Sequence, residues 1–395
     1  MQQHTKGAMI EMSDKFSLVE TSQDPIISPS PRLPAEILSL ILSRILPSSV
    51  KLWTTHLLRD FIHVLLSCCL VSKAWCGPAR EMLYKSIRLS QLESLYLLLR
   101  TVRSESFGGH CPAFALHFRP SFPDFALIKD IRKFATLAGE IVVCCPKLLF
   151  LTGDCGLLDF TSTMSYPRYP FLTYLKVSEQ NLKFLAPLLP HLCNLKSFEM
   201  LQSCGDSDML NDCFEPPSFK LSKLSISRTK LSPGLCKWLF ASSSESVESL
   251  KVEEVGSNLQ HLIEVMGGSV RELHIKSMFH YETKSDPESI KVISGLAGLR
   301  RLRIDGWDFK TEHLLNLQSS LETFAFSPYV ARVRELRTLL QSGWQPSLQS
   351  LDLHLGPFSS LESWGVLERA SRQWQDELTQ TCAARGIQLN EICPT

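Results

Sequence analysis

A stripe of apolar residues near the N-terminus recurs at helical spacing and predicts a first helix between Pro34 and Pro47. Proline suits the first turn of a helix, where its missing N–H is not needed. The carboxylate of Glu36 suits the same turn, because the helix dipole favours negative charge there. The stripe consists of Ile37, Leu38, Ile41, Leu42 and Ile45.

A second stretch, from about Leu57 to Leu70, is apolar on most of its circumference. Such a pattern predicts a helix that is buried on several sides. A further segment from Pro78 to Tyr84 leads into Ile87-Arg88-Leu89, whose alternation predicts a short strand.

Beyond this strand the pattern changes to a repeated unit, apolar-x-x-apolar-x-apolar. Its central residues run from 151 to 351, which is 200 residues in eight intervals and a mean spacing of 25. Leucine-rich repeats have periods of about 20 to 29 residues. The full copies lie at 172–177, 195–200, 221–226, 247–252, 270–275, 299–304, 321–326 and 348–353, and a weaker copy is Leu148-x-x-Leu151.

Helix-like stretches separate these strands, and each strand–turn–helix unit has an apolar face that only its neighbours can cover. The pattern therefore predicts an α/β fold, a short all-helical module followed by a curved leucine-rich-repeat-like solenoid. The expected division is a disordered leader at 1–30, the helical module at 31–90, the solenoid at 91–360 and a helical C-terminal cap at 361–395. The helix-like stretches are 181–189, 235–240, 258–266, 288–296 and 333–340, with a longer amphipathic one at 361–385.

Charge changes this picture little, because 41 Lys and Arg residues nearly balance 40 Asp and Glu residues. A chain so close to neutral has no global electrostatic reason to bind nucleic acid or an anionic membrane. The longest strongly apolar run, Phe61 to Val71, is too short to span a bilayer, and the first 30 residues contain no signal-peptide stretch. We therefore expect no membrane and no nucleic-acid partner, and a cytoplasmic or nuclear protein.

The thirteen cysteines are odd in number and contain no CxxC pair, and several lie inside apolar stretches. We expect them to act as small buried hydrophobes in a reducing compartment. A reactive or metal-binding thiol is the alternative. Those inside apolar stretches are Cys68, Cys69, Cys144, Cys145, Cys193 and Cys236.

Motifs that carry catalysis are not found in the sequence: it has no GxGxxG, GxxxxGK[ST], GxSxG or HExxH. Its eleven histidines are scattered, and none pairs with cysteine at zinc-finger spacing. We therefore predict a protein that is not an enzyme and needs no cofactor or metal. A hidden Cys–His nucleophile is the remaining enzymatic alternative.

The N-terminal stretch Leu33-Pro34-Ala-Glu36-Ile37-Leu38, together with Leu70-Val71-Ser72-Lys73-x-Trp75, resembles an F-box. Tyr84-x-x-Ile87-x-Leu89 is similar to the strand that follows the F-box in many family members. The resemblance covers about residues 32–90, and the downstream repeats resemble the leucine-rich region of F-box proteins in general pattern. From Leu33 to Trp75 the chain is several residues longer than the usual F-box core, with the excess around 47–56.

The resemblance implies a substrate-recognising subunit of an SCF-type cullin–RING ubiquitin ligase. The helical module would bind a Skp-family adaptor and through it a cullin, the solenoid would bind an unknown protein substrate, and other subunits would perform catalysis. The alternative is a leucine-rich-repeat scaffold without ligase association, in which the apolar stripe is ordinary core. Trp75 is expected to pack inside the module. The expected adaptor-binding residues are Leu33, Pro34, Ile37, Leu38, Ile41, Leu66, Leu70 and Val71.

Side chains between the leucines of each repeat should point to one common surface, because strand side chains alternate. This mixed-charge ladder is a candidate substrate-binding face, and a simply solvated strand face is the alternative. Glu253, Lys276, Asp305 and His354 lie two places further along their strands. The candidate residues are Lys176, Glu199, Lys251, His274, Arg303 and Asp352.

Overall fold

The structure is a computed structural model, and its chain divides into two compact units, Met1–Arg80 and Glu81–Thr395. The described part of the first is all helical, and we call it the helical unit. We call the second the repeat unit. The structure describes residues 34–45, 55–103, 115–119, 128–154, 156, 158–161, 168–205, 215–253, 258–276, 293, 295–305, 314–317, 320–327, 330–354, 373 and 376–392.

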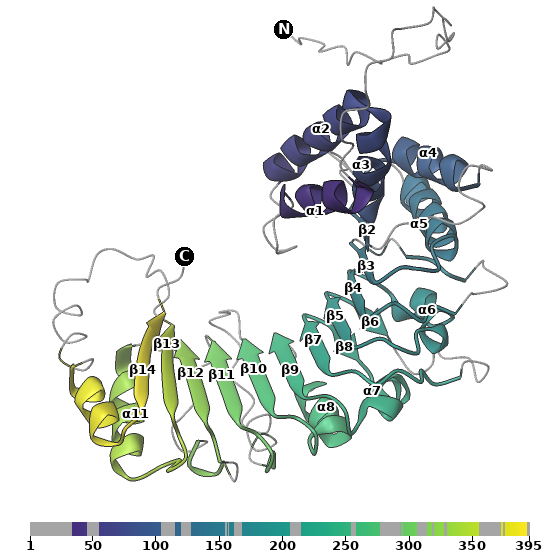
Figure 1. Ribbon diagram of the computed structural model, residues 1–395. Coiled ribbons are helices and arrows are strands. Elements are labelled where there is room, and N and C mark those ends of the chain that lie inside the picture. The colour runs from purple at the N-terminus through teal and green to yellow at the C-terminus, as the bar shows by residue number, and fades with distance from the viewer. Residues whose placement is uncertain are drawn as a thin grey trace, which may run out of the picture. The chain divides into compact units, whose positions relative to one another are not determined.

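The helical unit contains α1 (Ala35–Ile45), α2 (Thr55–Val71) and the start of α3 (Lys73–Lys85), which extends past the division between the units (Figure 1). The Pro34 carbonyl accepts hydrogen bonds from the N–H groups of Ile37 and Leu38 in the first turn of α1, at 3.0 and 3.2 Å. These helices confirm two of the predictions. The third helix was expected at Pro78, but it begins at Lys73 and contains Pro78.

Twelve strands in the described part of the repeat unit form one parallel sheet, and they follow one another in chain order (Figure 1). The fold is therefore mixed α/β, and a strand lies at each of the nine predicted repeat centres. The strands are β1 (Ser86–Leu89), β2 (Ala115–Phe118), β3 (Phe150–Gly153), β4 (Tyr174–Ser178), β5 (Ser197–Leu201), β7 (Lys223–Ser227), β9 (Ser249–Glu253), β10 (Glu272–Lys276), β11 (Arg301–Asp305), β12 (Thr323–Ser327), β13 (Ser350–His354) and β14 (Gln388–Ile392). A separate pair is β6 (Cys204–Gly205) with β8 (Lys230–Leu231).

At both ends the sheet extends beyond the solenoid boundaries predicted from the sequence, which were residues 91 and 360. The strand β1 pairs in parallel with β2, so it belongs to the repeat unit and not to a helical module that ends at residue 90. The strand β14 pairs in parallel with β13, so the C-terminal cap contains a strand as well as a helix at residues 376–384. Neither β2 nor the pairing of β14 is apparent from the repeat pattern, because both lie outside the series of nine copies.

The two faces of the sheet differ in burial. In β4, for example, Leu175 and Val177 are fully buried, whereas Tyr174 and Lys176 remain partly exposed. The same alternation recurs through the repeats, and the buried residues join into one continuous hydrophobic core. Parallel sheets are usually covered on both faces. Here one face keeps contact with solvent, and we call it the open face.

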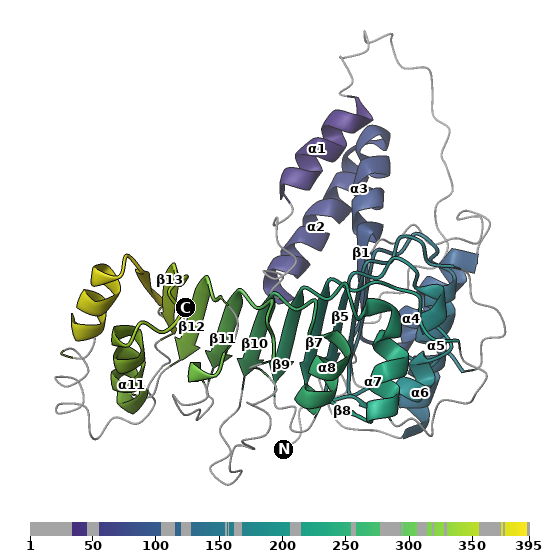
Figure 2. The same ribbon diagram turned by 90° about the horizontal axis from the view of Figure 1, so that it is seen from below.

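Helices connect the strands, and α6, α7, α8 and α11 lie on one side of the sheet (Figures 1 and 2). The bounds of α8 are those predicted from the sequence, and the stretch predicted at 288–296 lies largely outside the described residues. The helices are α4 (Leu92–Arg103), α5 (Ile128–Val143), α6 (Leu182–Leu185), α7 (Pro233–Phe240), α8 (Asn258–Met266) and α11 (Val330–Gln341), with short 3₁₀ turns at Leu189–His191 and Ala241–Ser243.

A common turn ends three consecutive strands. Glu179, Gln202 and Arg228 each follow the last residue of a strand and have positive φ angles of 52°, 49° and 49°. Each N–H donates to the carbonyl of the last residue in the neighbouring strand, at 2.7, 2.8 and 2.8 Å. This repeated bond fixes where each strand ends and so keeps the rows of side chains on the open face in register.

Candidate functional site

The first candidate surface lies on α1. Its apolar residues were predicted to form one stripe, but the structure divides them into two sets. Leu38 and Leu42 are buried, with 1% and 0% exposure, whereas Ile37, Leu40 and Ile41 are exposed. The spacing explains both sets, because residues three or four apart share a side of a helix.

The C-terminal half of α2 also has exposed apolar residues. Only Leu65 is buried among its described large aliphatic residues, and Leu70 is 87% exposed. The prediction that this helix is buried on several sides is therefore wrong for the half whose side chains the structure describes. The exposed aliphatic residues of α2 are Ile62, Val64, Leu66, Leu70 and Val71.

We define the apolar helical surface as the exposed aliphatic residues of both helices. Of the residues expected to bind an adaptor, Leu38 is part of the core and Leu33 lies outside the described residues. Pro34 is exposed next to this surface, and Trp75 is partly buried. Sequence reasoning missed Leu40, Ile62 and Val64, although helical spacing relates Leu40 to Ile37 and Ile62 to Leu66. The apolar helical surface is Ile37, Leu40, Ile41, Ile62, Val64, Leu66, Leu70 and Val71.

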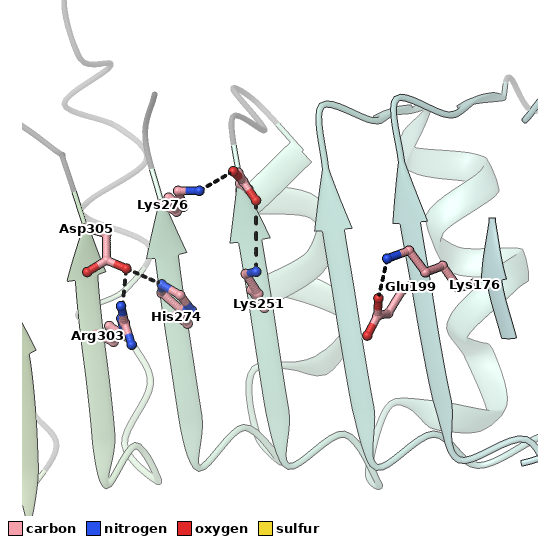
Figure 3. A network of polar contacts seen from close by, with 8 residues as sticks. Lys176, Glu199, Lys251, His274, Lys276, Arg303 and Asp305 are labelled. Atoms are coloured by element: carbon pink, nitrogen blue, oxygen red, sulfur yellow. Dashed lines mark hydrogen bonds and ion pairs between the residues drawn. The ribbon is translucent and has the colours of Figure 1, made fainter. Parts of the chain in front are cut away.

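The second candidate surface is the open face of the repeat unit. Strand register places Lys176 opposite Glu199, and His274 between Lys251 and Arg303 (Figure 3). Ser225 and Ala325 continue the row, which passes through all six expected residues. We call it the central row, and between β4 and β13 it reads Lys176, Glu199, Ser225, Lys251, His274, Arg303, Ala325 and Asp352.

The first end of the central row has an aromatic neighbour. Phe150 and Tyr174 lie beside one another on β3 and β4, with ring centroids 5.9 Å apart, and Phe150 is exposed. Burial raises the pKa of Tyr174, and both the charge of Glu199 and a hydrogen bond to it add to this effect. Glu199 also pairs with Lys176 at 3.5 Å. Aromatic and charged groups therefore meet at this end of the face.

Asp305 joins the central row to the residues two places further along. Its Oδ2 atom lies 2.8 Å from His274 Nε2 and 2.8 Å from Arg303 Nε (Figure 3). The other carboxylate oxygen is buried and has no hydrogen-bond partner among the described residues. Burial alone would raise the pKa of Asp305, but the hydrogen bonds from His274 and Arg303 hold this pKa below its usual value.

Glu253 forms a similar centre one strand earlier. It lies 2.8 Å from Lys276 and 4.0 Å from Lys251. Burial opposes ionisation here too, but the two lysines hold the pKa of Glu253 below its usual value. The sequence places these residues on one surface but does not predict that two basic groups share each carboxylate. The side chain of His354 lies outside the described residues.

Asp352, at the other end of the central row, contacts neutral groups. Its Oδ1 atom accepts hydrogen bonds from Asn390 at 2.8 Å and from Ser350 at 2.9 Å. Asn390 lies on β14, whose pairing was not predicted. Among the described residues, Asp352 is therefore held by hydrogen bonds from β13 and β14 and not by a basic partner.

None of the described cysteines takes part in a disulfide. Cys145 and Cys236 are buried as expected, and burial raises the pKa of Cys236 to about 11, so this thiol stays protonated near neutral pH. Cys193 is exposed, which differs from the prediction, because its neighbours Leu192 and Leu195 turn into the core instead.

Within the described residues no group of three or more His, Cys, Asp or Glu side chains is arranged to hold a metal ion. Nor does any described helix combine the length and apolar character needed to cross a membrane. A search against family models and a search of curated proteins both find no match to this chain.

Proposed function

We propose that this protein is the substrate-recognition subunit of an SCF-type cullin–RING ubiquitin ligase. In this proposal the helical unit binds a Skp-family adaptor, and the repeat unit is a leucine-rich-repeat-like solenoid that binds a protein substrate. The observation that carries the proposal is the apolar helical surface. It includes residues of both sequence elements that resemble an F-box.

The energetics of this surface favour a bound partner. Fully burying a large aliphatic side chain is worth about 1.5 to 3 kcal/mol, so several exposed together represent a large driving force for association. Ile37, Leu40 and Ile41 have the i, i+3, i+4 spacing with which a helix contacts an apolar groove. The resemblance to an F-box implies that the Skp-family adaptor is the partner with this groove.

The open face supports the second half of the proposal. Aromatic residues and arginine contribute most to protein–protein binding energy, and the open face presents both Phe150 and Arg303. Its mixed charges provide specificity for one partner over others. In this assembly the chain binds the adaptor and the protein substrate, and other subunits perform ubiquitin transfer.

Capture of a purified Skp-family adaptor tests the proposal. The double variant Ile37→Asp/Ile41→Asp places two charges in the contact, and each desolvated charge costs roughly 2 to 5 kcal/mol. We expect adaptor capture to fall to background. Leu97→Asp on α4 is the matched control, because it adds a charge at an exposed leucine outside the helical unit and should leave capture unchanged.

Circular dichroism of each variant verifies that it is folded. Both exchanged isoleucines are exposed, so the fold should tolerate them better than a change at the buried Leu38. If wild type and double variant both give background capture, the ligase assignment fails. The alternative is then a leucine-rich-repeat protein-binding scaffold without ligase association.

A further inference from the structure

Basic groups outnumber acidic groups at the centre of the open face. Lys251 and Lys276 share the carboxylate of Glu253. His274 and Arg303 share the carboxylate of Asp305. Two carboxylates thus serve four basic side chains on β9, β10 and β11. The ion pair of Glu272 with Arg301 on the same strands is neutral. Even with His274 neutral, Lys251, Lys276 and Arg303 therefore exceed Glu253 and Asp305 by one positive charge.

The basic groups also lie nearer to solvent than the acidic groups. The side chains of Lys251, Lys276 and Arg303 are 44%, 42% and 40% exposed, whereas those of Glu253 and Asp305 are 15% and 13% exposed. An approaching molecule therefore meets the ammonium and guanidinium groups first. We call the four basic residues Lys251, His274, Lys276 and Arg303 the basic patch (Figure 3).

The carboxylates beneath hold the basic patch in place. Arg303 uses Nε to contact Asp305, so the terminal nitrogens of its guanidinium are not engaged by that bond. A guanidinium fixed in this way is prepared for a charge-assisted contact with a further carboxylate. Ordering the side chain before binding reduces the entropy cost of association.

The basic patch is short and has acidic residues beyond both of its ends. Along the central row, neutral Ser225 and Ala325 flank it, and Glu199 and Asp352 follow. From β9 to β11 is two strand spacings, about 10 Å. A short cluster of carboxylates fits this length, whereas a nucleic-acid strand running along the row would place phosphates against Glu199 and Asp352.

We propose that the basic patch binds an acidic peptide segment of the partner protein. The inference rests on the proposed function, because that partner is the substrate of the repeat unit. It goes further by stating the chemistry that the repeat unit selects, which is clustered Asp and Glu side chains.

Fluorescence anisotropy of the full chain with three labelled probes tests this inference. The probes are a short peptide of glutamate, glycine and serine, its twin with glutamine in place of glutamate, and an oligothymidine of similar length. We expect the glutamate peptide to bind at least about fivefold more tightly than its twin, as a few ion pairs allow. Raising the salt concentration should reduce this preference.

Three double variants locate the contact. Lys251→Gln/Lys276→Gln should abolish the preference for glutamate, and Lys251→Arg/Lys276→Arg should retain it. Lys183→Gln/Lys237→Gln removes the same charge from exposed positions on α6 and α7, outside the open face, and should leave the preference unchanged. The arginine variant separates loss of charge from loss of folding.

Equal binding of the glutamate and glutamine peptides would overturn the inference, as would equal losses in the two glutamine double variants. Oligothymidine bound as tightly as the glutamate peptide, with the same dependence on Lys251 and Lys276, would assign the patch to nucleic acid instead. Adaptor capture is measured on the same preparations. Because the adaptor contact lies in the helical unit, capture stays intact if only the peptide inference fails.

Discussion

Regularly spaced leucines have different environments in the strands of the repeat unit and in the C-terminal half of α2. In the repeat unit Leu175, Leu250 and Leu273 are buried, because the neighbouring repeats cover them. In the helical unit Leu66 and Leu70 are exposed on α2. Regularly spaced apolar residues are therefore buried in one part of the chain and exposed in another. Where similar repeats stack on both sides, the apolar residues form a core, and where they do not, some of these residues stay exposed.

The largest expected effect is on the free energy of unfolding, and it compares a buried leucine of the repeat unit with an exposed isoleucine of the helical unit. Leu250→Ala removes a fully buried side chain and should lower the free energy of unfolding of the repeat unit by about 2 to 5 kcal/mol. Ile37→Ala at the apolar helical surface should change the free energy of unfolding by less than about 1 kcal/mol. Urea denaturation followed by circular dichroism measures both. Equal losses would mean that Ile37 is part of a core, against our description of that surface.

An intermediate effect concerns Asp305 and depends on pH. Its pKa is lower in the folded chain than in the unfolded chain, so the carboxylate stabilises the fold above the unfolded pKa of about 4. That contribution is lost as the pH falls through the folded pKa. Asp305→Asn should therefore cost about 1 to 3 kcal/mol at neutral pH, and the difference from wild type should shrink in acid.

Denaturation of wild type and Asp305→Asn at a series of pH values measures this difference. Asp352→Asn is the control, because the described contacts of Asp352 are with the neutral Asn390 and Ser350. A difference for Asp305→Asn that stays constant down to strongly acidic pH would contradict the charge-assisted bonds from His274 and Arg303.

The smallest effect concerns the turns that end the strands of the repeat unit. Gln202 has a φ of 49°, a conformation that costs an L-residue about 1 kcal/mol relative to glycine. Gln202→Gly should therefore stabilise the repeat unit slightly, by about 0.5 kcal/mol after the entropy of glycine is included. Gln202→Val should destabilise it, because a β-branched residue is poorly suited to positive φ. The midpoints of urea unfolding of wild type and the two variants are compared. A valine variant as stable as the glycine variant would contradict the expectation that the positive φ of residue 202 strains an L-residue.

Much of the sheet was predictable from the sequence. A strand side chain alternates between two faces, so the apolar-x-apolar units located nine strands and placed Lys176 and Arg303 on one surface. The ends were not predictable in this way. The strands β2 and β14 lack the full repeat and depend on pairing with β3 and β13 for their place in the sheet.

The apolar helical surface was predictable only in part. Ile37, Leu38, Ile41 and Leu42 all lie at helical spacing, and spacing does not state which side of a helix meets a neighbour. Packing decided that Leu38 and Leu42 are core. The sharing of Asp305 between His274 and Arg303 likewise depends on the register of β10 against β11.

The sequence by itself determined the α/β class, the period of the repeats and the residues that share the central row, because these follow from local periodicity. Only the tertiary structure decided which aliphatic residues of α1 and α2 stay exposed, and which carboxylates lie beneath basic side chains. Burial depends on contacts between segments distant in sequence. The sharing of Glu253 and Asp305 by basic residues of two strands depends on such contacts as well, so no local pattern contains either.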